Sequence, residues 1–372
     1  MLVPAAIDFT ESLHQGELAL KIAGEIGQRS DEAYTLIHMA MLLGPRGEYA
    51  RGLEVAQCGL DIAEDIEHHQ WMTAGHRVLG ALHLDLLALS KAQQHLEQAL
   101  ALAQEIGSWF WTRNASALLA SVYIGLNNLV RAQALLTAVP DSDAPPKTQA
   151  HRLIWYVRAQ LSLAQGKPDS VLAITEQLLA SAANVSGEES IPHLAHLRGR
   201  ALTLLNQPEE AEQSLQAARA GAITRGLRPL LWRINIDLGN LYHNQRNDAD
   251  AEQAFAFAQE LIEEIAAPIA DIALRTHFLE QATALLPLQE PLSSRRAAKR
   301  AFGGLTERER EIAALIAQGK TSKEMAEMLV VNSRTIEKHI ENIFSKLGFN
   351  SRTQIALWAS EKGLGQKEWS QF

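Results

Sequence analysis

The stretch SKAQQHLEQALALAQEI, residues 90–106, carries one apolar face at helical spacing and leads into Glu105-Ile106-Gly107. The same ending occurs 40 residues earlier as Asp65-Ile66-Glu67, and 80 residues earlier as Glu25-Ile26-Gly27. A looser version continues at Thr224–Gly226 and at Glu264–Ala266. Because a fixed period of roughly 20 to 50 residues is typical of repeat proteins, this spacing predicts a stacked array of helix pairs.

Four other segments carry an apolar face of the same kind: EYARGLEVAQCGLDIAEDI (48–66), DSVLAITEQLLASA (169–182), EEAEQSLQAARAGAI (209–223) and DADAEQAFAFAQELIEEI (248–265). Small residues open the second helices of successive units and let two helices approach closely: Ala50, Ala92, Ala132, Ala211 and Ala251. No part of residues 1–290 alternates with period two for long enough to form a strand. Since one pair cannot bury its apolar face alone, stacking must supply the core of this all-α fold.

The first repeat is incomplete in the sequence. Residues 14–27 have the pattern of a second helix whose first helix is short or missing, or is replaced by a cap over 4–13.

The composition is that of an ordinary soluble protein, with 47% hydrophobic and 21% charged residues in a chain of 372. No apolar run reaches the roughly 18 residues of a membrane helix, and MLVPAAIDFT at the start lacks the regions of a signal peptide. The single cysteine, Cys58, fits a reducing compartment, and its apolar neighbours indicate a buried thiol. We therefore expect a cytoplasmic protein that makes no membrane contact.

Charge and composition change near the C-terminus. The net formal charge is −9, yet residues 295–362 hold 13 Lys and Arg against 8 Asp and Glu. A basic end on an acidic body indicates that any polyanion meets the C-terminal part. The helical pattern stops near Leu286, before the Pro-, Ser- and Arg-rich PLQEPLSSRRAAKRAFGG. These boundaries predict a helical-repeat domain over 1–286, a linker over 287–303 and a small domain over 304–372.

The stretch QGKTSKEMAEML, residues 318–329, suggests either a phosphate-binding loop or a turn between two helices. A phosphate-binding loop needs a glycine five positions before Gly319, where this chain has Ala314, and it must follow a strand. The residues before it instead have the apolar spacing of a helix. Both observations favour the turn.

Each helix around this turn has its own start or stop signal. Four residues are suited to N-caps: Thr306, Thr321, Asn332 and Ser351. The two threonines are each followed three positions later by a glutamate, which completes a capping box. Gly319 and Gly348 stand where a helix ends in the left-handed conformation. Short capped helices around a glycine-containing turn predict a helix-turn-helix unit.

The third helix of this unit, SRTIEKHIENIFSKL, is amphipathic. Its apolar stripe consists of Ile336, Ile340, Ile343 and Leu347. The opposite face consists of Arg334, Lys338, Glu341 and Ser345, with Glu337 beside them. That polar face would enter a DNA major groove, or it is the solvated face of a packing helix.

The run LTERERE…IAQGKTSKEMAEML…VNSRTIEKHIENIFSKLGFNSRTQ closely resembles the DNA-binding domain of LuxR-type (NarL/FixJ, GerE) regulators over residues 304–365. In that family the third helix reads the major groove and the fourth often forms a dimer contact. The resemblance implies DNA contacts from Arg334, Thr335, Lys338 and His339, with Glu337 and Glu341 also facing the groove. It implies phosphate contacts from Lys320, Lys323, Lys346 and Arg352. Many members have basic residues in place of the two glutamates; Glu337 is a candidate base reader because a carboxylate can accept from cytosine N4.

The repeats resemble a tetratricopeptide-like superhelix in a 40-residue variant, whose concave surface usually binds partners. The whole arrangement resembles the C-terminal half of MalT-like (LAL) regulators, which carry an ATPase module before such a superhelix. Because these 372 residues contain no phosphate-binding loop, we expect no ATPase module of that kind within them, whether the chain is a natural short form or a fragment.

Aromatic and histidine clusters provide further candidates. Trp109 and Trp111 would line a ligand pocket, although first helices of such pairs also carry bulky residues into the core. His68-His69 and the pair His193 and His196 lack a further ligand at suitable spacing, so we expect no metal site.

Together these features predict a sequence-specific DNA-binding transcriptional regulator whose superhelix senses a small-molecule effector or a protein partner. The expected partners are double-stranded DNA, RNA polymerase or another protein, and further copies of the chain on DNA. The alternative is a protein-interaction scaffold with only auxiliary DNA affinity. Because the sequence has no Gly-x-Ser-x-Gly, His-Glu-x-x-His or glycine-rich nucleotide motif, we expect neither catalysis nor a cofactor.

Overall fold

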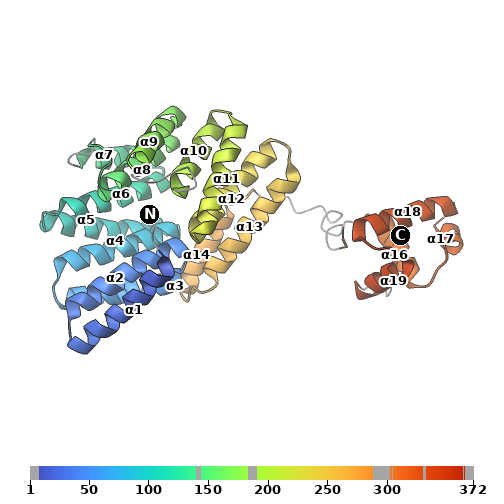
Figure 1. Ribbon diagram of the computed structural model, residues 1–372, viewed down its shortest axis with the longest axis horizontal. Coiled ribbons are helices and arrows are strands. Elements are labelled where there is room, and N and C mark those ends of the chain that lie inside the picture. Colours follow the sequence, from blue (N-terminus) through green and yellow to red (C-terminus); the bar gives the residue numbers. More distant parts are fainter. Residues whose placement is uncertain are drawn as a thin grey trace. The chain divides into compact units, whose positions relative to one another are not determined.

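The computed structural model describes residues 8–139, 144–182, 191–287, 302–303, 305–329, 332–362 and 364. The regular structure within these ranges is α-helical throughout, as predicted. The chain divides into two compact units, Met1–Leu286 and Pro287–Phe372 (Figure 1). The expected linker over 287–303 lies almost entirely outside the described residues. No described helix has the length and apolar composition needed to cross a membrane.

Helices of the first unit pair with their neighbours in sequence, and the most extensive contacts join α2 to α3, α4 to α5, α10 to α11 and α12 to α13. The helices are α1 (Phe9–Ile26), α2 (Arg29–Arg46), α3 (Tyr49–Asp65), α4 (His69–Asp85), α5 (Leu89–Glu105), α6 (Trp109–Gly125), α7 (Leu129–Ala138), α8 (Gln149–Ala164), α9 (Pro168–Ala180), α10 (Pro192–Leu204), α11 (Pro208–Thr224), α12 (Arg228–Asn244), α13 (Asp248–Ala266) and α14 (Ile272–Thr283). Helix α1 packs on α2 and starts earlier than the expected residue 14.

Left-handed residues end most helices of the first unit, at intervals of about 20 residues or, from Asn127 to Gly166 and on to Asn206, of about 40. They are Gly27, Gly47, Glu67, Leu87, Gly107, Asn127, Gly166, Asn206, Gly226 and Arg246. Glycine adopts this conformation freely, whereas an ordinary side chain pays roughly 1–2 kcal/mol for it. Two helices and two such turns make one 40-residue repeat, which explains the period seen in the sequence. The last sequence mark differs, because α13 runs helically through Ala266.

Small residues on both helices of a pair set the distance between them. A Cβ added to Gly80 of α4 would lie 3.3 Å from the carbonyl oxygen of Ala92 in α5. Gly199 of α10 has the same relation to Ala211 of α11, again at 3.3 Å. Two of the small residues predicted on the second helices, Ala92 and Ala211, therefore meet glycines on the first helices.

Helix α3 differs from its prediction in two details. Cys58 is exposed rather than buried. At about 100° per residue it is turned well away from Ala56, which is buried. Ala50 is only half-buried, and Gly52 occupies the position that corresponds to Ala92 one repeat later.

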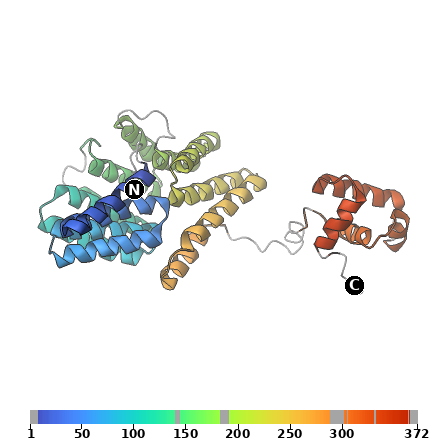
Figure 2. The same cartoon turned by 60° about the horizontal axis from the view of Figure 1, so that its bottom comes forward.

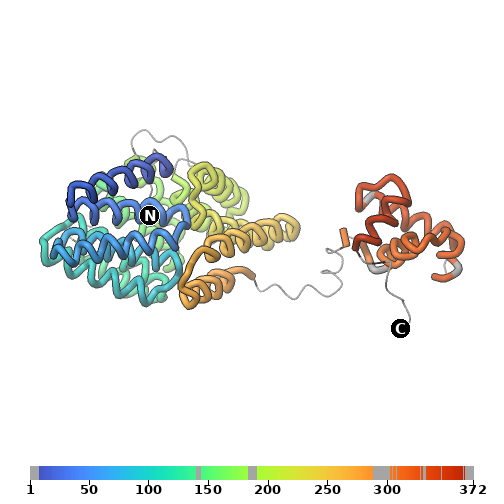
Figure 3. The backbone as a smooth tube through the Cα atoms, turned by 90° about the horizontal axis from the view of Figure 1, so that it is seen from below, coloured from blue at the N-terminus to red at the C-terminus, as the bar shows by residue number. Residues whose placement is uncertain are grey.

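The first unit curves until its C-terminal helices meet its N-terminal ones (Figures 1 and 2). Figure 3 follows the backbone of α14 to the N-terminal helices. Arg233 of α12 donates a hydrogen bond to the Asp85 carbonyl oxygen at 3.1 Å. The His277 ring of α14 lies 3.1 Å from the Leu87 carbonyl oxygen. These contacts join residues more than 140 positions apart and close the superhelix into a ring.

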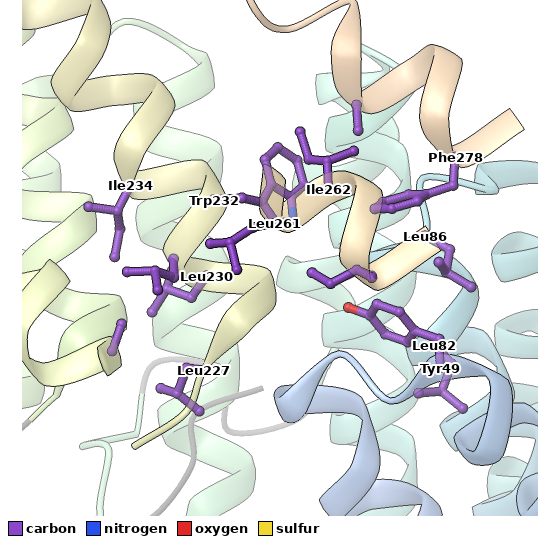
Figure 4. Close-up of a cluster of buried hydrophobic side chains, with 14 of the residues drawn as sticks. Tyr49, Leu82, Leu86, Leu227, Leu230, Trp232, Ile234, Leu261, Ile262 and Phe278 are labelled. Carbon is purple, nitrogen blue, oxygen red and sulfur yellow. The ribbon is translucent and has the colours of Figure 1, made fainter. Parts of the chain in front are cut away.

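A hydrophobic cluster seals this closure. Tyr49 and Leu86 come from the N-terminal side, and Trp232, Ile262 and Phe278 come from the C-terminal side (Figure 4). The five side chains are almost wholly buried. The rings of Trp232 and Phe278 meet edge to face, with centroids 6.5 Å apart. Burial of large aromatic and aliphatic side chains is a major source of stability, so the closure is an integral part of the core.

Three histidines lie together at the α4–α5 contact. His76 Nδ1 is 3.1 Å from His95 Nδ1, and the rings of His83 and His95 stack with centroids 5.6 Å apart. Burial lowers the pKa of His76 to about 4, and the neighbouring His95 contributes to the shift. Burial lowers the pKa of His83 to about 4 as well, with His95 and Lys91 adding to the effect and Asp271 opposing it.

This cluster predicts that acid destabilises the first unit. The unfolded chain binds protons near the ordinary histidine pKa of 6.5, whereas the folded cluster resists them down to about 4. The corresponding stability is therefore complete above that ordinary pKa and falls as the pH drops toward 4. Calorimetry should show the melting temperature falling by several degrees from about pH 7 to about pH 5. His95→Gln should flatten this dependence; an unchanged slope in the variant would contradict the assignment.

Candidate nucleic-acid interface

The second unit contains α16 (Glu307–Ala317), α17 (Ser322–Met328), α18 (Ser333–Leu347) and α19 (Arg352–Glu361). Thr306 and Glu309 form the predicted capping box of α16, with bonds of 3.3 and 2.7 Å. Gly319 follows α16 in the left-handed conformation, at φ +78°. Thr321 and Glu324 form an equivalent box at the start of α17, with bonds of 3.3 and 2.7 Å. The turn interpretation of Gly-Lys-Thr is thus confirmed.

The predicted ends of the last two helices are also confirmed. Asn332 Oδ1 accepts a hydrogen bond from the Thr335 amide at 2.8 Å at the start of α18. Gly348 ends α18 at φ +67°. Ser351 caps α19 together with Gln354. These local signals define where each helix begins and which side chains stand at its first turn.

A small core fixes the rotation of α18. Ile336, Ile340 and Ile343 are buried, and Leu347 packs against the same cluster. Helix α17 contributes Met325 and Ala326 to this core, with Leu329 packed beside them. Arg308, which sequence reasoning missed, donates to the Leu329 carbonyl oxygen at 2.9 Å and so ties α16 to the end of α17. The buried isoleucine stripe turns the opposite face of α18 outward.

That outward face carries both signs of charge. Arg334, Glu337, Lys338 and Glu341 are all exposed. Lys338 Nζ lies 3.0 Å from Glu341 Oε2 one turn later, so these two charges compensate each other in the free protein. The Ser345 side chain lies outside the described part of the chain. Within the described residues, Arg334 and Glu337 are therefore the charged groups of this face that form no ion pair, and they stand nearest the helix start.

Thr335 and His339 flank the polar face and are half-buried. Thr335 Oγ1 donates to Asn332 Oδ1 at 2.9 Å, which makes it part of the cap. His339 Nδ1 is buried and has no hydrogen-bond partner among the described residues. Only part of each side chain is thus available to a ligand in the groove.

Three of the four expected phosphate contacts lie around the start of α17. Lys323 is exposed in its first turn, and Lys320 lies just before it. Arg352 of α19 donates to Ser322 Oγ at 3.0 Å and to the Lys320 carbonyl oxygen at 3.4 Å. These bonds hold a guanidinium beside the start of α17, where Lys320 and Lys323 also lie in the sequence.

Lys346, the fourth expected phosphate contact, already has a partner within the domain. Its Nζ lies 2.6 Å from Glu309 Oε2, in an ion pair with a carboxylate whose side chain is 3% exposed. Burial alone raises the pKa of Glu309, but the bonds from Lys346 and Thr306 outweigh it and hold that pKa below its ordinary value. This pair joins α18 to α16, and the lysine side chain remains partly exposed, at 35%. Lys346 and Glu309 are 37 positions apart, so no local sequence pattern indicates that they form an ion pair.

The two tryptophans proposed as ligand-binding residues separate in the structure. Trp111 is buried, at 8% exposure, and lines a cavity in the first unit. Trp109 is 58% exposed and is not among the residues that line this cavity. Phe110, between them, lines the cavity while 46% exposed. Of these three aromatic residues only Trp111 belongs to the hydrophobic core, and it lines the cavity as well.

Two of the histidines considered as possible metal ligands contact acidic side chains instead. His196 Nε2 lies 2.6 Å from Asp237 Oδ2, and His69 Nδ1 lies 3.3 Å from Glu105 Oε1. Within the described residues, no group of three or more histidine, cysteine or acidic side chains is arranged to hold a metal ion.

Comparison with known proteins identifies the second unit. Residues 304–359 match the family described as bacterial regulatory proteins, luxR family (GerE). The HTH-type transcriptional regulator Rv0890c of Mycobacterium tuberculosis is 24% identical over 216 residues, which cover 57% of this chain and 22% of that protein. The transcriptional regulatory protein LiaR of Bacillus subtilis is 50% identical over 60 residues, which cover 16% of this chain and 28% of LiaR.

A solved structure resembles the helical repeats. The apo form of RapI superposes with a TM-score of 0.52 at 12% sequence identity, covering 70% of this chain and all of RapI. At that identity the likeness is one of fold alone.

The second unit is accordingly a helix-turn-helix domain of the LuxR family, as the sequence predicts. The first unit has a helical-repeat fold shared with RapI. The matched segments span only 22% and 28% of the two named regulators, so the similarity defines this domain rather than the activity of the whole chain.

Proposed function

We propose that the chain is a sequence-specific DNA-binding transcriptional regulator. The polar face of α18 supports this most strongly, because a buried stripe holds it outward in a LuxR-family domain. A major groove about 12 Å wide admits one α-helix, and recognition helices contact base edges with residues near their N-terminus. Arg334 and Lys338 lie in the first two turns of α18 and are exposed. They are the side chains that we assign to base edges and neighbouring phosphates.

The remaining side chains of the interface receive secondary roles in this proposal. Glu337 is placed to accept from cytosine N4, while Glu341 restrains Lys338. Lys320, Lys323 and Arg352 position the domain on the phosphate backbone, which carries affinity without sequence information. Thr335 and His339 contribute at the edge of the groove.

The test is selection of binding sites by the purified full-length chain from a random-sequence duplex pool, at low and at physiological salt. We expect enrichment of a repeated motif at both salt concentrations. Binding that disappears with salt and enriches nothing would instead indicate a scaffold with only electrostatic DNA affinity.

Arg334→Ala should weaken binding to the selected site by about 10- to 100-fold, because a good side-chain contact to a base is worth about 1–3 kcal/mol. Fluorescence anisotropy with the selected duplex measures this loss. Lys362→Ala, an exposed basic residue at the end of α19, is the matched control and should retain nearly full affinity. Both variants should melt like the parent. Undiminished affinity of Arg334→Ala would remove α18 from the proposed interface.

The first unit has the proposed role of sensing an effector or a protein partner. One small module buries only about 600–1,000 Å² on DNA, so we propose that two or more copies bind together on repeated half-sites. Contact with RNA polymerase or another protein, and a cytoplasmic location, belong to the same proposal.

A further inference from the structure

The first helices of the repeats surround a cavity of about 1180 Å³ inside the first unit. Its walls come from α2, α4, α6, α8, α10 and α12, so it is the concave face of the superhelix. Contacts between α2 and α12 close the ring around it. This volume exceeds the usual range of small-ligand pockets, about 300–1,000 Å³, and therefore has room for a ligand of that class.

Apolar side chains and side-chain amides line most of the cavity wall, and only a few charged side chains are present. The lining includes three arginines and two aspartates, and neither lysine nor glutamate. Asp237 is occupied, because its Oδ2 lies 2.6 Å from His196 Nε2 and 3.6 Å from Arg200 Nε. Arg233 donates to two backbone carbonyl oxygens, at 2.7 and 3.1 Å, and lies 4.2 Å from the centre of the Trp232 ring.

Arg77 of α4 is the arginine of this wall that lacks such partners. It is 3% exposed, and its Nη2 contacts only Met41 Sδ, at 2.9 Å. Its Nε is buried without a hydrogen-bond partner, and within the described residues no carboxylate lies at ion-pair distance. The Trp111 ring lies 5.7 Å away. Burial lowers the pKa of Arg77 to about 10, so it remains charged near neutral pH.

An unpaired buried charge is expensive, since its lost hydration is not replaced. A sulfur atom is only a weak acceptor, and a ring face returns about 2 kcal/mol to a buried cation, which is less than the several kcal/mol that the lost hydration of an ion costs. The same guanidinium presents donors in a planar fork that matches a carboxylate. An anionic group that enters the cavity and pairs with the Arg77 guanidinium would offset the free-energy cost of burying that charge.

Four aromatic side chains share the cavity wall with this guanidinium. Tyr34 and Trp71 lie with ring centroids 5.0 Å apart, and Phe110 meets Trp111 edge to face at 4.8 Å. All four line the cavity. Tyr34 and Phe110 are 43% and 46% exposed although they lie on a concave wall, so these rings offer uncovered apolar area. An apolar or aromatic ligand body would cover them.

We propose that this cavity binds a small organic carboxylate, whose carboxylate pairs with Arg77 and whose apolar or aromatic body packs on Tyr34 and Phe110. The inference deepens the sensing role proposed for the first unit and rests on it. Among the described residues of this wall, Arg77 is the one guanidinium whose hydrogen-bond donors are left for a ligand, and the Asp85 carboxylate lines the same wall. Both features favour a monoanion over a phosphate dianion, whose second charge would stay buried without a partner. A free organic acid and the C-terminus of a short peptide share this chemistry.

The experiment is calorimetric titration of the full-length chain with matched pairs of probes. The first pair is indole-3-acetate and its neutral amide, and the second is 3-phenylpropionate and its amide. The third is a phenylalanine-ended tripeptide with either a free or an amidated C-terminus. We expect saturable binding of a carboxylate, with its amide at least about tenfold weaker, as the loss of a charge-assisted pair requires. A response to the free acids or to the tripeptide distinguishes the two sources.

Arg77→Met should abolish the preference for carboxylate over amide in the responding pair. Arg51→Met, on the outer helix α3 and paired with Glu17, is the control and should keep it. Without ligand, Arg77→Met should melt at the same temperature as the parent or higher, because an apolar side chain of similar length removes an unpaired buried charge. A marked fall in that temperature would show that Arg77 serves the core, and would overturn the proposal.

Absence of saturable binding up to millimolar concentration for all three carboxylates, or equal affinity for acid and amide, would also overturn the proposal. The site selection on DNA is performed without these probes. A chain that enriches a DNA motif but binds no carboxylate therefore retains the proposed DNA-binding function and loses only this ligand. A chain that binds carboxylate through Arg77 but enriches no DNA motif retains the site and loses the regulatory role.

Discussion

Replacing Lys346 with methionine is expected to reduce the free energy of unfolding of the second unit by about 2–3 kcal/mol. Glu309 is 3% exposed, and Lys346 Nζ contacts both of its carboxylate oxygens, at 2.6 and 2.8 Å. Removing the ammonium leaves a buried carboxylate held only by the cap of α16. A domain of about 60 residues is marginally stable, so the variant should lose the proposed DNA binding through partial unfolding.

Hydrogen exchange of the full-length chain separates this effect from direct loss of a DNA contact. Peptides from α16 and α18 should exchange faster in Lys346→Met, while peptides from the first unit serve as an internal control. Arg334→Ala should leave exchange unchanged while weakening DNA binding. Normal exchange in Lys346→Met combined with weak DNA binding would restore Lys346 to the set of phosphate contacts.

A second substitution and a change of pH sharpen this test. Adding Glu309→Gln should recover most of the stability, because glutamine preserves a capping box and carries no charge. The folded-state pKa of Glu309 lies below its ordinary value of 4.5. Its ion pair therefore contributes stability above that pH, and the contribution is lost as the pH falls through the folded pKa. The gap between parent and Lys346→Met should narrow accordingly in acid.

Features with local causes could be predicted from the sequence. Each helix cap of the second unit bonds to a residue three positions away, so it could be recognised from its neighbours in sequence. These caps are Thr306, Thr321, Asn332 and Ser351. The 40-residue period could be recognised in the same way, because each repeat contains two turns and a left-handed residue marks most of them. The exposure of Arg334 and Lys338 followed from the isoleucine stripe on the other side of α18.

Features that join distant positions could not be predicted. Lys346 and Glu309 are brought together only by the packing of α18 on α16. In the sequence, Arg77 cannot be told apart from any other polar residue of an amphipathic helix, because its burial depends on the closure of the first unit. The prediction for Cys58 failed because neighbouring apolar residues do not show which face of α3 the thiol occupies. A periodic pattern also does not indicate how many repeats complete one turn of the superhelix. The closure of the first unit could therefore not be predicted from the sequence.

Phe278→Ala tests that closure and should reduce the free energy of unfolding of the first unit by about 3–5 kcal/mol, the usual cost of a buried phenylalanine. The side chain is fully buried, packs against Trp232 and lies beside Leu86 (Figure 4). Chemical denaturation measures the loss. Leu136→Ala, a fully buried position in the separate cluster around α7, provides a control of comparable size, about 2–5 kcal/mol.

The two variants should differ in where the loosening is seen. In Phe278→Ala, hydrogen exchange should rise in α14 and also around Tyr49 and Leu86, about 200 residues away in sequence, because these side chains seal one cluster. In Leu136→Ala it should rise around α6, α7 and α8. If Phe278→Ala loosened α14 alone, the ring would be held by its other contacts. If both ends loosen together, the cavity wall depends on the closure, and any ligand that fills the cavity must stabilise α14 against exchange.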